Sequence, residues 1–423
     1  MQKKLLAVAV TGALAAMGST LVQAQQSSSV QIYGTVYGEY AQISRSGYQK
    51  TDFLQNPGSE LGIKGEEKIG GGMSVWFQCA TTMDWRGESN VGTTNAQAVN
   101  SLCSRDSALG FKGDFGNVLA GQWSTPFKRV TNDLVGGEDT GIFGTAQFLY
   151  GSSSTFGLTQ PINNTTISTT GSGYNTTTTT SALGAGSWRR RQGNLIAYDT
   201  PTINGITGML ATTLGNLGTG LTAGQIKPRI YSIGMMYNNG PLALGYAFEQ
   251  HQNFYTTGAS STVGTVGSNA TLGTGENAWA LYGAYTLPNN LKVGAQMSQQ
   301  TATTAVGATS QVKTYHVGID WMFSGPHGVR AAYSHAGDVS GTGGATGTRV
   351  APVNVINGAT GNNGGSLYSI RYVYQLSKAT TLAAGYASVK NSVNGRYALG
   401  GASTTVTPGT SASGYGLSVK STF

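Results

Sequence analysis

The residues best able to do chemistry are few and lie far apart in the chain. They are two cysteines and four histidines, at Cys79, Cys103, His251, His316, His327 and His335. A structural or catalytic metal needs such ligands gathered at short, regular spacings, and no spacing of that kind occurs. Neither a G-x-x-x-x-G-K-[ST] nor an H-E-x-x-H motif is present. The sequence therefore predicts no metal site and no cofactor.

One histidine has a carboxylate in its neighbourhood. His316 and Asp320 lie four residues apart and share one face of a predicted strand, which separates them by about 13 Å along that strand. A base and its partner must be within hydrogen-bonding reach of each other. We therefore expect no enzymatic activity.

The composition excludes most soluble proteins. Charged residues make up 10% of the 423 positions and hydrophobic residues 39%, while glycine occurs 64 times. An average soluble protein has about 25% charged residues. The 21 Tyr, 12 Phe and 6 Trp argue against disorder. The chain thus has too little charge for a large solvated surface and too few apolar residues for a large packed core.

The first 24 residues are typical of a secretory signal. Lys3 and Lys4 precede an apolar stretch, and Val22-Gln-Ala24 resembles a cleavage site. A membrane anchor is the alternative, but the apolar stretch is too short, and no other window holds 18 consecutive apolar residues. We expect residues 25–423 to form one mature domain, whose formal charge falls from +8 to +6 with the loss of the two lysines.

In an exported chain, two cysteines indicate one disulfide, with two free thiols as the alternative.

Apolar and polar residues alternate with a period of two in many segments. In residues 315–323, for example, the apolar side chains fall on odd positions, and similar patterns occupy 30–40 and 242–249. This alternation predicts β-strands with one apolar and one polar face. No segment has a convincing helical period.

The connections between these segments are alternately short and long. Tight breaks are predicted near 69–72, 113–116, 201–205, 238–240, 288–290, 325–328 and 377–380. Longer polar connections are predicted near 43–58, 84–102, 125–187, 216–226, 251–275, 301–312, 338–365 and 391–412. Fifteen connections join sixteen strands of about ten residues, long enough to cross a bilayer when tilted.

This pattern predicts an all-β fold, a 16-stranded antiparallel transmembrane barrel. In lipid every backbone N–H and C=O needs a partner, so the sheet must close on itself. Apolar side chains would then face lipid and polar ones the water-filled interior, with no packed core needed. A soluble all-β secreted protein is the alternative, but it would not alternate short and long connections. The last strand ends on Phe423, the aromatic terminal residue that outer-membrane barrels present to the barrel-insertion machinery.

Four stretches, together with the last strand, resemble one known family. They are residues 29–34, 61–78, 104–126 and 190–201. These stretches are similar to the general diffusion porins of Gram-negative bacteria, in their β-proteobacterial branch. The resemblance implies a homotrimer in the outer membrane, in contact with its lipid and lipopolysaccharide, that passes small hydrophilic solutes and does not bind nucleic acid. It also implies that the third outer loop folds into the pore.

In this chain the third outer loop is the connection 125–187. Its first half, Thr131–Tyr150, carries three acidic residues at Asp133, Glu138 and Asp139. Its second half, Pro161–Ser181, is an uncharged tract of Thr, Asn and Ser. We expect the first half to narrow the pore and the second to be an exposed insertion.

Strand parity assigns the charged residues to faces. A basic residue on the lipid side at mid-membrane would cost about 2–4 kcal/mol, which favours the interior. The predicted pore-lining bases are Lys64, Lys112, Arg189, Arg191, Lys292, Arg330, Arg371 and Lys420. Arg191 best matches the basic wall of the family. Glu60 departs from it, since many relatives have Arg there, and parity places Arg105 outward, above the membrane or beside a bulge.

The same parity puts Cys79 and Cys103 on one face of neighbouring strands. Both are odd-numbered, like the outward Phe77 and Leu109, so a disulfide between them would staple an outer loop.

The predicted function is passive diffusion through a water-filled channel, and a substrate-specific porin is the alternative. The latter would show an aromatic track along the lumen, for which Tyr33, Tyr37 and Tyr282 are too scattered. The predicted interior acids are Glu39, Glu60, Glu66, Glu249, Asp320, Asp133, Glu138 and Asp139. Eight acids against eight bases decide nothing by number. Basic wall residues facing acidic loop residues predict a field across the pore, and the mature charge of +6 predicts a weak anion preference that fades with salt.

Overall fold

The computed structural model describes residues 29–86, 102–132, 134–150, 188, 190–214, 229–252, 275–305, 308–341, 361–395, 397–400 and 407–423. The elements found there are almost all strands. None of the helices in these ranges is long and apolar enough to span a membrane. The predicted signal, Arg189 and Asp133 lie outside the described residues.

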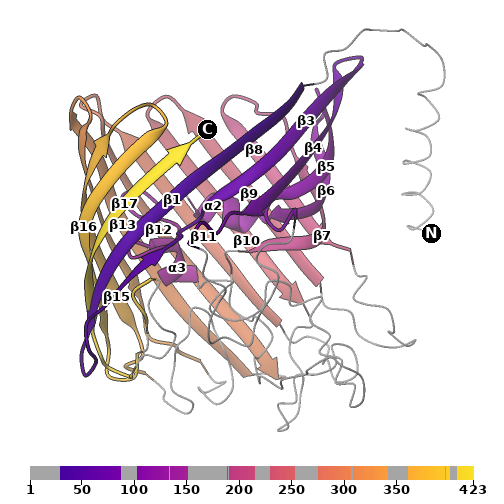
Figure 1. Ribbon diagram of the computed structural model, residues 1–423. Coiled ribbons are helices and arrows are strands. Elements are labelled where there is room, and N and C mark those ends of the chain that lie inside the picture. The colour runs from indigo at the N-terminus through magenta and orange to yellow at the C-terminus, as the bar shows by residue number, and fades with distance from the viewer. Residues whose placement is uncertain are drawn as a thin grey trace, which may run out of the picture.

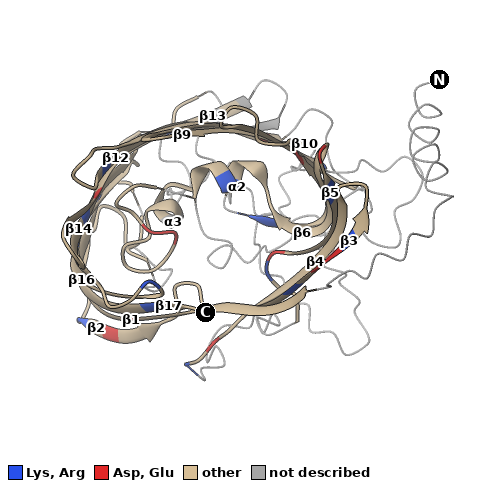
Figure 2. Ribbon diagram, turned by 90° about the horizontal axis from the view of Figure 1, so that it is seen from above, with Lys and Arg blue, Asp and Glu red and all other residues tan. Residues whose placement is uncertain are grey.

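Seventeen strands form one closed antiparallel sheet (Figures 1 and 2). The first nine are β1 Ser29–Arg45, β2 Thr51–Gln55, β3 Glu60–Gly70, β4 Met73–Thr82, β5 Ser107–Gly113, β6 Gly116–Ser124, β7 Arg191–Asp199, β8 Ile206–Thr213 and β9 Arg229–Asn239. The others are β10 Leu242–Gln252, β11 Gly275–Thr286, β12 Leu291–Ala305, β13 Ala308–Ser324, β14 His327–Ala336, β15 Gly365–Gln375, β16 Thr380–Asn391 and β17 Ala412–Thr422.

The barrel has sixteen strand positions around its circumference, as the sequence predicts, because β2 and β3 are two parts of one interrupted strand. β2 pairs with residues 39–43 of β1, and β3 pairs with residues 29–35 of the same strand. On its other edge β1 pairs with β17, from Thr35 opposite Thr422 to Arg45 opposite Ala412, which closes the sheet. Closure pairs the first strand of the sheet with the last, so neither is left with a free edge along this seam.

The last residue takes part in the closure. Phe423 and Gly34 exchange two backbone hydrogen bonds of 3.0 Å, which continue the ladder past the end of β17. A side chain at Gly34 would overlap the ring of Phe423, so the glycine makes room for that ring. Phe423 is therefore a structural part of the seam between the first and last strands.

Two of the predicted long connections are shorter than expected. β1 continues to Arg45 and β2 begins at Thr51, within the expected loop 43–58. Likewise β12 continues to Ala305 and β13 begins at Ala308, within the expected loop 301–312. The polar composition of these segments was misleading, because the ladder joins backbone groups and does not require apolar side chains.

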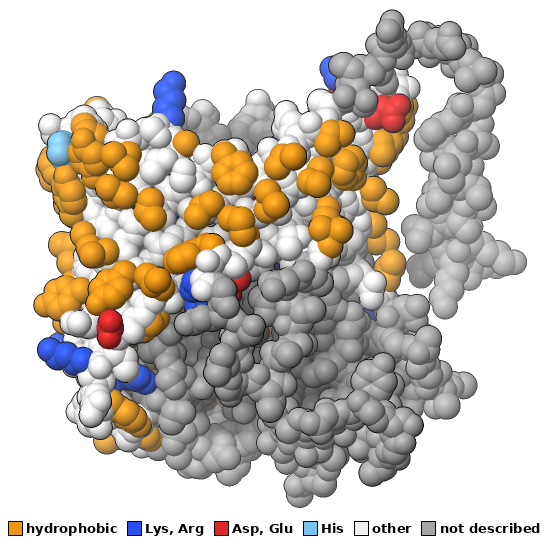
Figure 3. Space-filling model, viewed as in Figure 1, with side chains coloured by type: hydrophobic (Ala, Val, Ile, Leu, Met, Phe, Trp, Pro, Cys, Tyr) orange, Lys and Arg blue, Asp and Glu red, His pale blue; other side chains and the backbone are white. Residues whose placement is uncertain are grey.

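The outer face of the barrel is apolar, as alternation predicts. Val30, Ile32, Leu109 and Leu417 expose 66, 69, 66 and 58% of their surface, respectively. Figure 3 shows hydrophobic side chains gathered over this face, whereas the charged side chains visible there lie toward the two ends. This distribution suits a bilayer, which accepts apolar side chains and excludes charges.

The interior contains a packed core, which the sequence analysis did not expect. The segment that follows β6 packs Phe127, Ile142, Phe143 and Leu149, all 1% exposed or less, against the inner wall. The wall contributes small or branched residues, namely Ala41, Ile43, Ala247, Ala278, Ala280, Ala336, Leu367, Ala387, Val389 and Ala412. Where the wall is covered in this way, inward positions are apolar because they contact protein rather than water.

Candidate functional site

In the part of the chain that the structure describes, two short helices lie in the lumen, meaning the interior of the ring of strands. They are α2 Pro126–Thr131 and α3 Thr145–Tyr150, and both lie inside the ring when it is seen from above (Figure 2). The Thr125 side chain caps α2 by accepting a hydrogen bond from the Lys128 N–H at 3.4 Å, and Pro126 occupies the first turn. Both features favour a helix start at this point. We call residues 125–150 the inner segment.

The first part of the inner segment packs on the wall of β8–β11. The backbone N–H of Phe127 donates to Ser232 Oγ at 3.1 Å. Arg129 Nη1 lies 2.7 Å from Asp199 Oδ1 on β7, and Val130 fits against Gly245, which has no side chain to exclude it. One face of α2 is thus held by the wall.

The middle of the inner segment touches the wall backbone to backbone. His316 Nε2 donates to the Val135 carbonyl oxygen at 2.9 Å, while its Nδ1 lies 3.0 Å from Ser334 Oγ. A Cβ at Gly318 would overlap the same Val135 carbonyl, so only glycine permits this approach. His316 therefore anchors the inner segment to the wall.

Glu138 ties the inner segment to two arginines on the wall. Its carboxylate lies 2.9 Å from Arg371 Nη2 and 3.6 Å from Arg330 Nη1. Arg371 also donates to the Gly137 carbonyl oxygen at 2.8 Å, and its side chain is 3% exposed. We call these contacts the Glu138 clamp. Glu138, one of the predicted loop acids, thus contacts two of the predicted wall bases directly.

The clamp belongs to a row of charges in register across four strands. Lys292 on β12 lies opposite Asp320 on β13, and Asp320 lies opposite Arg330 on β14. Arg330 lies opposite Arg371 on β15. Asp320 Oδ2 is 2.8 Å from Arg330 Nε. Two like charges opposite each other destabilise a sheet, and here Asp320 and Glu138 compensate the arginines.

Glu39 on β1 holds the last part of the inner segment. Its buried carboxylate accepts hydrogen bonds from the Ile142 N–H at 2.8 Å and from Gln55 Nε2. Gln300 Nε2 donates to the Leu149 carbonyl oxygen at 3.0 Å. The inner segment is thus fastened at intervals from α2 to α3.

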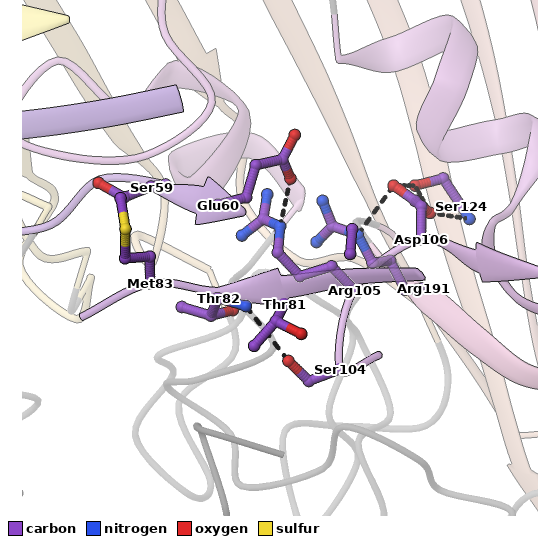
Figure 4. A network of polar contacts seen from close by, with 12 residues as sticks. Ser59, Glu60, Thr81, Thr82, Met83, Ser104, Arg105, Asp106, Ser124 and Arg191 are labelled. Atoms are coloured by element: carbon purple, nitrogen blue, oxygen red, sulfur yellow. Dashed lines mark hydrogen bonds and ion pairs between the residues drawn. The ribbon is translucent and has the colours of Figure 1, made fainter. Parts of the chain in front are cut away.

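A second cluster of charges lies on the wall formed by β3 and by the ends of β5 and β7 (Figure 4). Arg105 Nε lies 2.6 Å from Glu60 Oε2, and Arg191 Nε lies 3.0 Å from Asp106 Oδ2. Asp106 also accepts hydrogen bonds from the Ser124 backbone N–H and hydroxyl, at 2.6 and 2.8 Å. We call these four charged residues the arginine network.

The inward position of Arg105 corrects the parity assignment, which placed it outward. Arg105 precedes β5, which begins at Ser107, so strand parity does not apply to it. Burial alone would raise the pKa of Asp106, but the nearby Arg191, Lys128 and Ser124 outweigh burial and hold that pKa below its usual range. Asp106 therefore remains a carboxylate beside Arg191.

The other predicted basic residues differ in their partners. Lys112 Nζ is 2.6 Å from Glu66 Oε2, whereas Lys64 lies over the ring of Tyr33 and Lys420 over that of Tyr37. Within the described ranges, no carboxylate lies at ion-pair distance from Lys64 or Lys420. The predicted loop acid Asp139 lies in the inner segment, next to Glu138. That the eight predicted bases line a pore remains a prediction.

Sequence reasoning missed a buried cluster around His251. Its Nε2 lies 2.8 Å from Glu249 and its Nδ1 2.5 Å from Glu276, while its ring stacks on Trp188 at 4.5 Å. Arg190, 2% exposed, lies 3.4 Å from the same ring. The register of β6 and β7 shifts between Gly121 and Trp123, and this bulge prevents parity from locating Arg190. No group of three or more potential ligands in the described chain is arranged for a metal ion.

The disulfide between Cys79 and Cys103 is confirmed. Their Cα atoms lie 4.6 Å apart, and the bond joins β4 to the connection that leads into β5. Cys103 precedes β5 by four residues and has a positive φ of 60°. The bridge thus fixes a connection rather than two paired strands.

Comparison with known proteins agrees with this architecture. A model of the family described as Gram-negative porin matches residues 6–394. The major outer membrane protein P.IB of Neisseria gonorrhoeae is 29% identical over 133 residues, which cover 31% of this chain and 34% of that protein. The chain thus aligns with about a third of the length of this curated relative.

Solved structures share the fold at low sequence identity. The anion-selective porin from Comamonas acidovorans superposes with a TM-score of 0.66 at 19% identity, over 94% of this chain and 100% of that one. The trimer form of OmpT from Vibrio cholerae gives a TM-score of 0.58 at 12% identity, over 94% and 99%. The family match covers most of the sequence, and the chain is therefore a member of the Gram-negative porin family and an outer-membrane β-barrel protein.

Proposed function

We propose that the protein is a passive diffusion channel for small hydrophilic solutes and ions, and that it acts as a homotrimer. The observation that carries this proposal is a closed barrel with an apolar outer face and a charged lumen. The inner segment narrows that lumen, because it is fastened to the wall and cannot be displaced without breaking several polar contacts. The family and fold favour a channel over an enzyme, and small solutes would pass according to size and charge.

We further propose a weak preference for anions. In the part of the chain that the structure describes, several lumenal carboxylates lie within 3.6 Å of an arginine or lysine nitrogen, among them Glu60, Glu66, Asp106, Glu138, Asp199 and Asp320. Lys64 and Lys420 have no carboxylate partner in the described chain. Paired charges largely cancel at a distance, so the unpaired lysines leave a positive potential in the lumen. Salt screens such a potential, and the preference should fade as salt rises.

Conductance in a planar lipid bilayer tests this proposal. We expect stable steps, often in threes, and a zero-current potential in a potassium chloride gradient that favours chloride at low salt. Arg191→Glu should shift that potential toward cations, because it removes a base and leaves Asp106 without its partner. A folded trimer without conductance would refute the channel, and an unchanged potential would show that Arg191 lies away from the narrowest part.

The alternative of a substrate-specific channel has one observation in its favour. Trp76 and Trp123 lie 5.6 Å apart on the lumen side, beside Leu119 and Leu195. The Trp76 ring also covers Gly110, where a side chain would overlap it, so a purely structural role explains its position. Liposome swelling separates the two functions: rates that follow solute size alone indicate general diffusion, and one outlying solute class indicates specificity.

A further inference from the structure

A cavity of about 210 Å³ lies in the lumen wall on the side of the Glu138 clamp that faces the short β15–β16 connection. Its floor is formed by Val373, Ala383 and Ser418, which are successive cross-strand neighbours on β15, β16 and β17. These side chains are short, so the pleated wall is hollow at this point. Its rim carries longer and mostly basic side chains.

The charges that line this cavity are strongly unbalanced. Four are basic and one is acidic, namely Arg330, Arg371, Lys378, Lys420 and Glu138. Glu138 is already engaged by both arginines. No carboxylate in the part of the chain that the structure describes lies at ion-pair distance from either lysine. The cavity therefore has a net positive charge.

Two further carboxylates lie nearby but do not compensate the lysines. Asp320 is occupied by Arg330 at 2.8 Å. Glu39 lies opposite Ser418 in the ladder, and its carboxylate accepts hydrogen bonds from Ile142 and Gln55. Both acids are thus committed to contacts of the clamp or of the inner segment.

The lysines project from a well-fixed part of the wall. Lys420 lies between Tyr37 and Thr381 in the ladder, and its ammonium group is 5.4 Å from the centre of the Tyr37 ring. Lys378 belongs to the tight connection in which Ser377 Oγ accepts hydrogen bonds from the backbone N–H groups of residues 379 and 380. The backbone that carries each lysine is thus held in place.

We propose that this cavity binds a small oxyanion, such as inorganic phosphate or a short dicarboxylate. Such an ion is compact and offers several acceptor oxygens to the two ammonium groups. The cavity is smaller than the roughly 300–1,000 Å³ typical of sites for drug-sized ligands, which favours an ion of few atoms. The proposal rests on the proposed channel function, since the ion reaches the cavity from the lumen.

The test is the chloride current through the trimer as inorganic phosphate is added to one side of a planar bilayer. We expect phosphate to reduce the current to a saturating level, because a bound ion occupies the lumen wall and repels other anions. Replacing both lysines, by Lys378→Gln and Lys420→Gln, should raise the half-saturating phosphate concentration about tenfold, equivalent to about 1.4 kcal/mol. The single variant Lys420→Arg keeps the positive charge and should keep most of the affinity for phosphate, which distinguishes lost charge from faulty folding.

Two lysine variants serve as controls. Lys390→Gln removes a charge from the outer face of β16, where Lys390 lies over the exposed Tyr368, and should change neither current nor affinity. Lys64→Gln removes an unpaired lumenal charge outside the cavity. It should shift the zero-current potential without changing the half-saturating phosphate concentration.

The possible outcomes separate this inference from the channel function. Absence of conductance overturns the proposed function, whereas conductance without saturation by either phosphate or succinate, tested separately, overturns only the cavity. An equal loss of affinity in Lys64→Gln also overturns it, because the effect would then be a general potential. Calorimetric titration of phosphate into the detergent-solubilised trimer provides a binding readout that does not depend on conductance.

Discussion

Individual ion pairs determine which charges a solute meets in the lumen. Glu60 is paired with Arg105, and Asp106 with Arg191, so both arginines of the network are largely neutralised. Glu60 also stands where the resemblance to porins led us to expect a basic residue. A single side chain therefore reduces the positive potential on this wall.

Glu60→Gln should increase the preference for anions. The change leaves Arg105 without its carboxylate and adds one positive charge to the wall, so the zero-current potential should move toward that of chloride at low salt. Glu67→Gln is the matched control. Glu67 is also on β3, but its odd number places it on the outward face, near the short turn. If both variants shift the potential equally, local pairing at Arg105 does not set selectivity.

At the scale of elements, the inner segment depends on glycines in the wall as much as on charged groups. Gly318 admits the Val135 carbonyl, and Gly136, in the segment itself, has a φ of 75° and approaches the Ala331 carbonyl. These close contacts fix the depth at which the segment lies. The polar contacts of Glu39, Glu138 and His316 then fix its course along the wall.

Gly318→Ala should displace the inner segment. The added methyl group would overlap the Val135 carbonyl, so the segment must move away from β13 and weaken the hydrogen bond from His316. We expect an altered single-channel conductance and a loss of about 1–3 kcal/mol of stability, typical of overpacking. Gly283→Ala is the control, since its methyl group would meet only the Leu244 side chain, at 3.5 Å. Equal conductance in the two variants would argue against a segment that limits flow.

The disulfide stabilises a different element, the connection between β4 and β5. The two cysteines are 24 positions apart, and closing a loop of this length contributes about 3.5 kcal/mol in the chain-entropy estimate. Replacing both by Ser should lower the thermal midpoint of unfolding but leave the conductance unchanged, because the bridge does not belong to the lumen wall. Reduction of the native protein should reproduce the lower midpoint, and a change in conductance would contradict this separation.

In the whole molecule, the closure of the sheet and the packing of the inner segment on its inner wall depend on different contacts. The seam between β1 and β17, extended by Phe423, pairs the first strand with the last. The inner segment then gives one side of the barrel a packed core, while the arginine network remains on the wall of β3, β5 and β7. A solute would pass between a surface held by Glu138 and a wall carrying paired arginines.

Much of this architecture follows from the sequence alone. Period-two alternation and the spacing of turns predict the sixteen strands of the barrel, and the even number of cysteines predicts the disulfide. These are local properties, because the pleat sends successive side chains to opposite faces whatever lies beyond the strand.

Only the tertiary structure decides which charges are paired and which inward residues are covered. Arg371 contacts Gly137 across 234 positions, and His316 contacts Val135 across 181, and no strand pattern encodes such a meeting. Strand parity does not locate Arg105, because this residue precedes its strand, or Arg190, because this residue lies beside a bulge. The faces of the barrel follow from the geometry of single strands, whereas the electrostatics of the lumen arise from contacts between a folded-in segment and a closed wall.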